Sequence, residues 1–189
     1  PMKTLISELT LFPRVSVRFF FLLLILHFTF SFLHSSTLEV SLDGFHPYTT
    51  IQSAINTALP NDTVLVHPGR YYENLNFNGR SGITLASLEM TTADYSYVHS
   101  TIIDGNQNGS CIQIVNQEQN LTVRGFTITN GSGTWHYNNI YRGGGALYIE
   151  NYYEDNNNIS IDLTNLIIKG NIADGGGGIQ VFTSGYRTP

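Results

Sequence analysis

The sequence predicts an all-β solenoid whose strands are preceded by one α-helix. Two features of the 189-residue chain predict this fold. Short runs of alternating apolar and polar residues follow one another along most of the chain, and Gly, Asn and Asp separate them, as expected for short strands joined by turns. The runs also recur in register, which is typical of a solenoid, because one coil cannot bury its apolar face unless another coil stacks on it.

The helix is predicted over residues 51–59. Ile51, Ala54, Ile55 and Ala58 follow the i, i+3, i+4, i+7 spacing of one helical face. Either of the two threonines before Ile51 can cap the first turn, and the Pro-Asn pair after the last periodic residue ends the helix. Beyond this segment the sequence has no helical period, so the rest of the chain is predicted to form strands and turns.

Two sets of apolar runs align with each other. The first set is "CIQIVN", "ALYIEN" and "GIQVFT", at residues 111–116, 146–151 and 178–183. The second set is "LTVRGFTI" and "IDLTNLII", at residues 121–128 and 161–168. In the first set Ile112, Leu147 and Ile179 share an apolar column, and in the second set Val123 matches Leu163. The unequal distances between repeats indicate loops of variable length between strands of constant position.

The glycine-rich segments "RGGGAL" and "DGGGGI" are predicted to be corners of the solenoid. A phosphate-binding P-loop needs Lys followed by Ser or Thr after its glycines, and a dinucleotide-binding loop needs a helix. Here strand patterns follow both segments, beginning at Leu147 and Ile179. Glycine suits a corner where φ is positive or where stacked backbones exclude a Cβ atom. No nucleotide is therefore expected as a partner.

The composition excludes other partners. Only 12% of the residues are charged and the net charge is −5, so no basic surface indicates nucleic acid. The single cysteine, Cys111, rules out an intramolecular disulfide.

The first 36 residues are predicted to be a targeting segment. Arg14 and Arg18 precede an apolar run, Phe19–Leu33, of fifteen residues, which is shorter than the about 20 residues of a membrane span. A cleaved secretory signal peptide fits this pattern, and an uncleaved N-terminal anchor is the alternative. In both cases we expect residues 37–189 to be secreted or exposed at the cell surface, touching a membrane only through an uncleaved anchor. Because the chain stops without a terminating element, this domain is expected to be truncated at its C-terminal end.

The segment "YTTIQSAINTALPNDTVLVHPGRYYENLNFNGRSGITLAS" resembles the N-terminal turns of right-handed parallel β-helix proteins of the pectin-lyase-like superfamily. These proteins open with a capping helix, followed by a "V.V.pG.Y.E" strand and turn. The matching residues are Ile51, Gln52, Ala54, Ile55, Asp62, Val64, Val66, Pro68, Gly69, Tyr71 and Glu73. The resemblance implies a right-handed parallel β-helix with an N-terminal capping α-helix. It implies little about function, because the superfamily includes lyases, esterases, glycosidases, phage tailspikes and adhesins.

A second resemblance involves the segment "NIADGGGGI". It is similar to one repeat element of the polymorphic outer-membrane type, with the pattern N-x-A-x-x-G-G-x-I. The matching residues are Asn171, Ala173, Gly176, Gly177 and Ile179.

No catalytic residue, metal ion or cofactor is expected in this chain. Enzymes of the superfamily use clustered Asp with Arg, Lys or Gln on one outer sheet. By the repeat register, the aspartates along the coils do not stack into a pair; they are Asp62, Asp104, Asp162 and Asp174. The histidines outside the targeting segment lack metal-binding spacing; they are His46, His67, His99 and His136. Cys111 aligns with small residues and is predicted to pack in the core.

The most suggestive surface feature is an outward column formed by Gln113, Tyr148 and Gln180. Two loops flank it, residues 131–142 and 151–158. Both loops carry aromatic residues, and rigid rings with polar tips suit stacking on sugar rings; these residues are Trp135, Tyr137, Tyr141, Tyr152 and Tyr153. The ligand-binding residues are therefore predicted to be Gln113, Trp135, Tyr148, Tyr152 and Gln180, with an extended polysaccharide or a cell-surface glycan as the partner. In the competing interpretation, the same rings fold over the coil and shield it.

The sequence thus predicts a secreted or cell-surface β-helix module that is non-catalytic and serves binding, adhesion or structural presentation, with carbohydrate as the expected ligand. The alternative is the N-terminal part of a carbohydrate-active enzyme, similar to a pectin lyase, pectinesterase or glycosidase, whose catalytic coils lie beyond residue 189. A third possibility is an autotransporter-like passenger.

Overall fold

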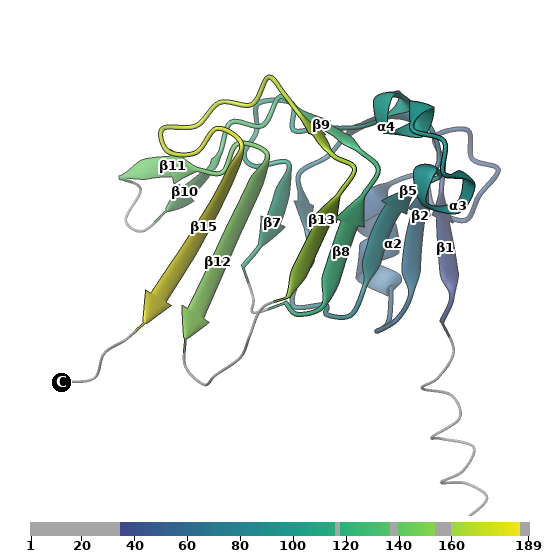
Figure 1. Ribbon diagram of the computed structural model, residues 1–189, viewed down its shortest axis with the longest axis horizontal. Coiled ribbons are helices and arrows are strands. Elements are labelled where there is room, and N and C mark those ends of the chain that lie inside the picture. The colour runs from purple at the N-terminus through teal and green to yellow at the C-terminus, as the bar shows by residue number, and fades with distance from the viewer. Residues whose placement is uncertain (1–34, 116–117, 137–139, 154–159, 186–189) are drawn as a thin grey trace, which may run out of the picture. The chain divides into compact units, whose positions relative to one another are not determined.

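A computed structural model describes residues 35–115, 118–136, 140–153 and 160–185 (Figure 1). The predicted signal peptide or anchor lies outside the described residues except for its last two, Ser35 and Ser36. No helix in the described ranges is long and apolar enough to cross a membrane. These ranges consist mostly of strands in parallel sheets with few helices. The predicted all-β class is confirmed at this level.

The strands form three parallel sheets, which we call A, B and C. Sheet A contains β1 (Thr37–Val40), β2 (Thr63–Val66), β5 (Thr84–Ser87), β8 (Leu121–Arg124) and β13 (Ile161–Thr164) in that order. Sheet B contains β3 (Gly69–Tyr72), β6 (Thr101–Asp104), β9 (Thr127–Thr129) and β14 (Ile167–Ile168). Sheet C contains β4 (Leu75–Asn76), β7 (Ile112–Ile114), β12 (Leu147–Tyr153) and β15 (Ile179–Gly185). An antiparallel hairpin, β10 (Thr134–His136) and β11 (Tyr141–Gly143), is inserted before β12.

The chain passes through sheets A, B and C in turn, starting at β2, and makes four such passages within the described residues. Each passage, called a coil below, places its strands beside those of the preceding coil in parallel pairing. The predicted columns are confirmed, because Leu147 pairs with both Ile112 and Ile179, and Val123 pairs with Leu163. The repeat register was readable from sequence because the inward positions of paired strands carry apolar residues in every coil.

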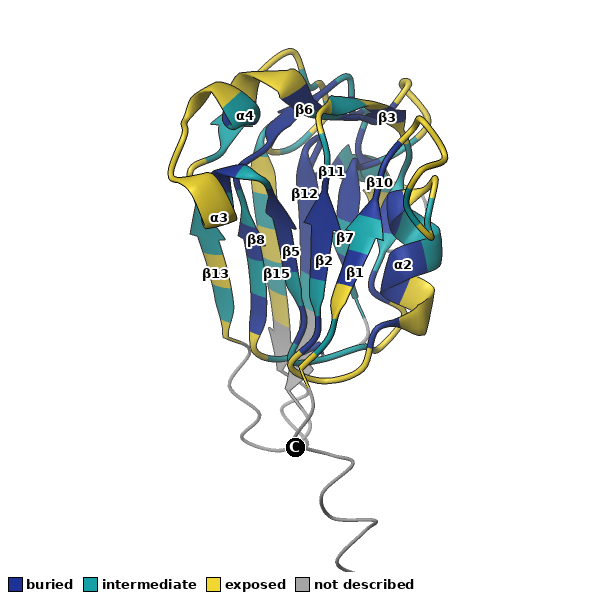
Figure 2. Cartoon of the chain, turned by 90° about the vertical axis from the view of Figure 1, so that its right-hand side faces the viewer, coloured by how far each residue is buried: buried dark blue, intermediate teal, exposed yellow. Residues whose placement is uncertain are grey.

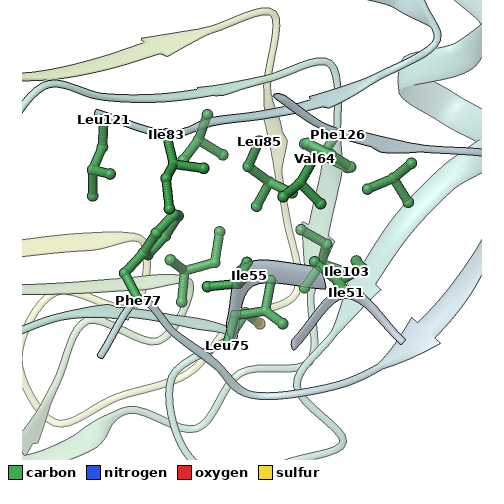
Figure 3. Packing of buried hydrophobic residues seen from close by; sticks show 14 of the residues in the cluster. Ile51, Ile55, Val64, Leu75, Phe77, Ile83, Leu85, Ile103, Leu121 and Phe126 are labelled. Carbon is green, nitrogen blue, oxygen red and sulfur yellow. The ribbon is translucent and has the colours of Figure 1, made fainter. Parts of the chain in front are cut away.

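The core lies between the three sheets (Figure 3). It is filled by buried side chains from each of them, such as Leu85 of sheet A, Ile103 of sheet B and Ile112 of sheet C. The side chains of the fourth coil are more exposed to solvent than those of the preceding coils. Ile179 and Val181 of β15 are 40% and 59% exposed, and exposed positions mark β15 in Figure 2.

The helix α2 (Ile51–Thr57) is confirmed and is two residues shorter than predicted. Thr50 is its N-cap, and the side chain accepts a hydrogen bond from the backbone amide of Ser53. Ile51 and Ile55 are fully buried and belong to the core cluster, and α2 contacts β1, β2 and β4. The apolar face of the helix therefore covers core side chains of the first coil.

The prediction that no further helix follows is wrong. Two short helices, α3 (Glu89–Thr92) and α4 (Ser96–Ser100), connect β5 to β6. Segments of four and five residues span little more than one turn, which is too short to display a helical period. The buried carboxylate of Glu89 holds α3 in place, because it accepts hydrogen bonds from Arg124 at 3.0 Å and from Asn165 at 2.7 Å. In α4, the carbonyl of Val98 accepts a hydrogen bond of 2.8 Å from the Thr127 hydroxyl of β9.

The structural interpretation of the glycine segments is confirmed. The amide of Gly144 donates to the carbonyl of Gly175, and the amide of Gly145 donates to that of Gly176, both at 3.2 Å. The two segments therefore stack backbone on backbone in successive coils. A Cβ atom on Gly145 would collide with the carbonyl oxygen of Gly177. Among the glycines at 143–145 and 175–178, φ is positive only at Gly144 and Gly176, where it is 58° in both cases.

Candidate functional site

The predicted outward column exists as a line of paired residues. Tyr148 in β12 pairs with Gln113 in β7 on one side and with Gln180 in β15 on the other. Parallel strands set neighbouring residues of such a column about 4.8 Å apart. The structure, however, gives the three side chains different environments.

Tyr148 does not reach solvent, so the prediction of its exposure is wrong. The residue is 1% exposed, because the β10–β11 hairpin lies over it. Its hydroxyl lies 2.6 Å from Nδ1 of His136, and the His136 ring stacks on Phe182 with centroids 3.7 Å apart. The segment 131–142 therefore covers the column at Tyr148 through His136, whereas its Trp135 ring stays half-exposed. Alternation along a strand tells which side of the sheet a residue faces, but it does not tell whether a distant segment covers that side.

Gln180 is half-buried, and its side chain lies against the glycine corner. A Cβ atom placed on Gly143 or Gly175 would meet its Oε1 atom. This oxygen is buried without a hydrogen-bond partner among the described residues. Oε1 of Gln180 therefore does not point into solvent, where a ligand would meet it.

Tyr152 belongs to a strand, although the sequence predicted a loop over 151–158. β12 continues through Tyr153, and Tyr152 pairs with Ser184 of β15. Residues 154–159 lie outside the described residues. The ligand-binding role assigned to Tyr152 stays a prediction.

Gln113 and Trp135 come together at an open hollow of about 430 Å³. The residues that line it, which we call the Trp135 hollow, are Gln107, Asn108, Gly109, Gln113, Ser132, Gly133, Thr134, Trp135 and Arg142. They come from the β6–β7 turn, from β7, from the segment between β9 and β10, and from the hairpin. The aromatic ring is available to a ligand, since Trp135 is 55% exposed. Two of the five predicted residues thus share one site.

Arg142 fixes one side of the Trp135 hollow. Its guanidinium carbon lies 5.6 Å from the centroid of the Trp135 ring, within the range of a cation–π contact. Asp174 holds the same residue, because its Oδ2 atom accepts from the Arg142 backbone amide at 2.9 Å and lies 3.5 Å from Nε. These contacts orient the arginine side chain beside the indole.

Hydrogen bonds also attach the β6–β7 turn to the hairpin. The amide of Gly109 donates to the hydroxyl of Ser132 at 2.9 Å, and the amide of Ser132 donates to the carbonyl of Gly109 at 2.8 Å. The hydroxyls of Ser110 and Thr134 lie 2.8 Å apart. Both walls of the Trp135 hollow are therefore held in place before any ligand arrives. The described residues that line it offer amides, hydroxyls, one indole ring and one guanidinium, and none is a carboxylate.

The coil aspartates occupy separate places, as the register predicted. Asp162 lies exposed in β13, whereas Asp104 is 1% exposed at the end of β6 and is ion-paired with Arg70. Burial alone would raise the pKa of Asp104. Hydrogen bonds from the Asn106 amide, the Asn130 side chain and Arg70 outweigh burial and hold this pKa below its usual value.

Cys111 packs in the core, as predicted. It is fully buried, and its sulfur lies 3.2 Å from the carbonyl oxygen of Thr129. Burial raises the pKa of the thiol to about 12, so the nucleophilic thiolate does not form near neutral pH.

One cluster was missed by sequence reasoning. Glu39, His46 and His67 bring one carboxylate and two imidazoles together, although their spacing matches no metal motif. The signal that could have found part of it is strand pairing, since β1 and β2 set Glu39 and His67 on the same outer face.

Comparisons with protein-family models and with curated protein sequences find no match for this chain. In the described residues, stacked parallel sheets carry an open hollow lined by polar residues and one indole ring.

Proposed function

We propose that the chain is a secreted or cell-surface module, built as a right-handed parallel β-helix of the pectin-lyase-like type, that binds extended carbohydrate without chemical conversion. The repeated passage through three parallel sheets supports the β-helix. The helix next to the first coil supports a cap, because terminal caps keep solenoids soluble by covering the open core. Export through the segment 1–36 belongs to the same proposal.

The observation that carries the proposed function is the half-exposed Trp135 ring in a preorganised polar hollow. The flat face of a sugar ring packs well on an indole, while its hydroxyls need donors and acceptors around the rim. Gln113 and Asn108 offer side-chain amides that can both donate and accept. The volume of about 430 Å³ lies within the range of small-ligand sites, about 300–1,000 Å³.

The ligand is expected to be an extended chain with weak affinity per unit. The hollow is open, so a bound sugar keeps one side in water. Affinity therefore depends on few contacts, and neighbouring units of a polymer have to add to it.

The test is binding of soluble plant and microbial polysaccharides to the full chain, measured by calorimetry, with Trp135→Ala and Tyr72→Ala compared. Tyr72 is a matched control, because it is 65% exposed in β3 and lies outside the Trp135 hollow. Trp135→Ala should weaken binding about tenfold, and Tyr72→Ala should leave it unchanged. Equal binding by all three proteins would contradict the proposal.

The alternative, an N-terminal part of a carbohydrate-active enzyme with catalytic coils beyond residue 189, rests on the family resemblance. This alternative is tested with the protein encoded by a longer reading frame, which should release reducing or unsaturated ends from pectin. Release by the 189-residue chain itself would overturn the non-catalytic proposal.

A further inference from the structure

The outer face of sheet A at its β1 edge carries three side chains with metal-binding atoms. Leu38 and Val40 of β1 are buried in the core, so Glu39 between them faces outward. β1 pairs in parallel with β2, which sets Glu39 opposite Leu65. His67 follows two residues later and therefore lies on the same outer face.

The turn after β1 brings the third side chain. The amide of Ser41 donates to the carbonyl of Tyr48 at 2.9 Å, which closes the turn over residues 41–48. Inside the turn, Asp43 accepts hydrogen bonds from the Ser41 hydroxyl and from the amide of Phe45. This folding returns His46 over β1. His67 is fixed in turn by its own backbone amide, which donates to the carbonyl of Val40 at 2.9 Å.

The three potential ligand atoms converge. Oε2 of Glu39 lies 2.9 Å from Nδ1 of His46 and 2.9 Å from Nε2 of His67. All three atoms lie within 4.8 Å of one another, and the two rings stack with centroids 4.1 Å apart. Around a tetrahedral zinc ion with bonds of about 2.0–2.1 Å, ligand atoms lie about 3.3–3.4 Å apart. To admit an ion, each imidazole nitrogen therefore has to move about 0.5 Å farther from the carboxylate oxygen than its present 2.9 Å.

Charge and access favour a cation. The side chains of Glu39, His46 and His67 are 38%, 30% and 24% exposed, so an ion can enter from solvent and keep water as a further ligand. Asp43 is exposed in the same turn as His46 and is ionised at neutral pH. A second ionised carboxylate therefore adds negative charge beside the cluster.

We propose that Glu39, His46 and His67 form a binding site for a divalent transition-metal ion that fastens the 41–48 turn to the β1 edge of sheet A. Imidazole with one carboxylate is a donor set that suits Zn²⁺, Cu²⁺ and Ni²⁺, whereas Ca²⁺ and Mg²⁺ prefer oxygen ligands. Without a metal ion, the contacts between the Glu39 carboxylate and the two imidazoles hold the three side chains together. The experiment below distinguishes this metal-free pairing from a metal-binding site.

Zn²⁺ is the probe, titrated into the full chain by calorimetry, with Ca²⁺ as a second titrant. We expect one tight Zn²⁺ site per chain and no Ca²⁺ binding at that site. Glu39→Gln, His46→Gln and His67→Gln should each weaken Zn²⁺ binding by at least about tenfold. His99→Gln is the matched control, because His99 belongs to α4 and is not a member of the cluster, and it should bind Zn²⁺ as the unmodified chain does.

Thermal unfolding provides an independent measurement. Saturating Zn²⁺ should raise the midpoint of the unmodified chain and of His99→Gln, and should leave that of Glu39→Gln unchanged, because only a competent site couples binding to folding. Absence of Zn²⁺ binding would overturn the proposal. So would binding that survives both His46→Gln and His67→Gln, since the metal would then be bound elsewhere in the chain.

Discussion

The carboxylate of Glu73 accepts a hydrogen bond of 2.8 Å from the backbone amide of Ile51, the first residue of α2. Its second oxygen accepts from the amide of Gln52 at 2.9 Å. Glu73 follows β3 and lies more than twenty residues after the helix start, so this contact attaches the helix to the first coil. A carboxylate at a helix N-terminus also interacts favourably with the helix dipole.

Replacing Glu73 should therefore loosen the helix. Glu73→Ala removes both hydrogen bonds from the first turn, and we expect the free energy of unfolding to fall by about 1.5–3 kcal/mol, the range for hydrogen bonds to a charged group. Urea denaturation measures the change. Asp162→Asn serves as the control, because Asp162 is exposed in β13 and such surface changes stay within about 0.5 kcal/mol. Equal stability of both variants would contradict the capping role.

The sequence predicts those parts of this structure that are periodic. Ile51, Ala54 and Ile55 reveal α2 by their spacing, and the apolar columns through Leu147 reveal the pairing of β7, β12 and β15. The helices α3 and α4 escape prediction because they are shorter than the pattern that identifies a helix.

The candidate site is less predictable from sequence, because the exposure of each residue depends on which distant segment of the chain covers it. The sequence predicts Trp135 and Gln113 as an aromatic and an amide residue at the outward column, and in the structure both line the Trp135 hollow. Tyr148 satisfies the same sequence criteria, yet the hairpin buries it. The cluster of Glu39 with two histidines requires the fold of the 41–48 turn, which no local pattern specifies.

The glycine corner provides a matched pair of substitutions. Gly145→Ala would place a methyl group against the carbonyl of Gly177, and both backbones have to shift. At Gly178 the nearest atom to a new Cβ is a methyl carbon of Ile168 at 3.8 Å, which is an ordinary contact. We expect Gly145→Ala to lower the free energy of unfolding by about 1–3 kcal/mol, and Gly178→Ala to change it by less than about 0.5 kcal/mol. Denaturation of the two variants side by side measures this, and a larger loss at Gly178 would refute the stacking argument.

Asp104 should make the fold sensitive to acid. Its pKa is lower in the folded chain than the ordinary value of 3.8, so protons bind the unfolded chain more tightly. The stability that this carboxylate contributes is therefore fully present above pH 3.8 and is lost as the pH falls through the folded-state pKa. Asp104→Asn should lower the free energy of unfolding at pH 7 by about 1–3 kcal/mol, toward the lower end because Arg70 is 42% exposed and stays hydrated.

The measurement is urea denaturation of Asp104→Asn and of the unmodified chain at pH 7 and pH 3. The difference between the two proteins should shrink at pH 3, since Asp104 binds a proton more readily in the unfolded wild-type chain than in the folded one, and this favours unfolding of the wild type only. A difference that is the same at both pH values would show that the effect of the substitution is steric and not electrostatic.

Tyr148 and Trp135 should separate stability from binding. The Tyr148 hydroxyl lies 2.6 Å from Nδ1 of His136 and 3.3 Å from Oε2 of Glu150, so Tyr148→Phe removes hydrogen bonds beneath the hairpin. We expect this change to cost about 0.5–1.5 kcal/mol per lost bond while polysaccharide binding stays intact, because the ring is buried and does not line the Trp135 hollow. Trp135→Ala should show the reverse, with a nearly unchanged denaturation curve and weakened binding, because this half-exposed ring contributes little to the core. If instead Tyr148→Phe abolishes binding at unchanged stability, the ligand reaches the column beneath the hairpin, and the hairpin is a movable cover over the site.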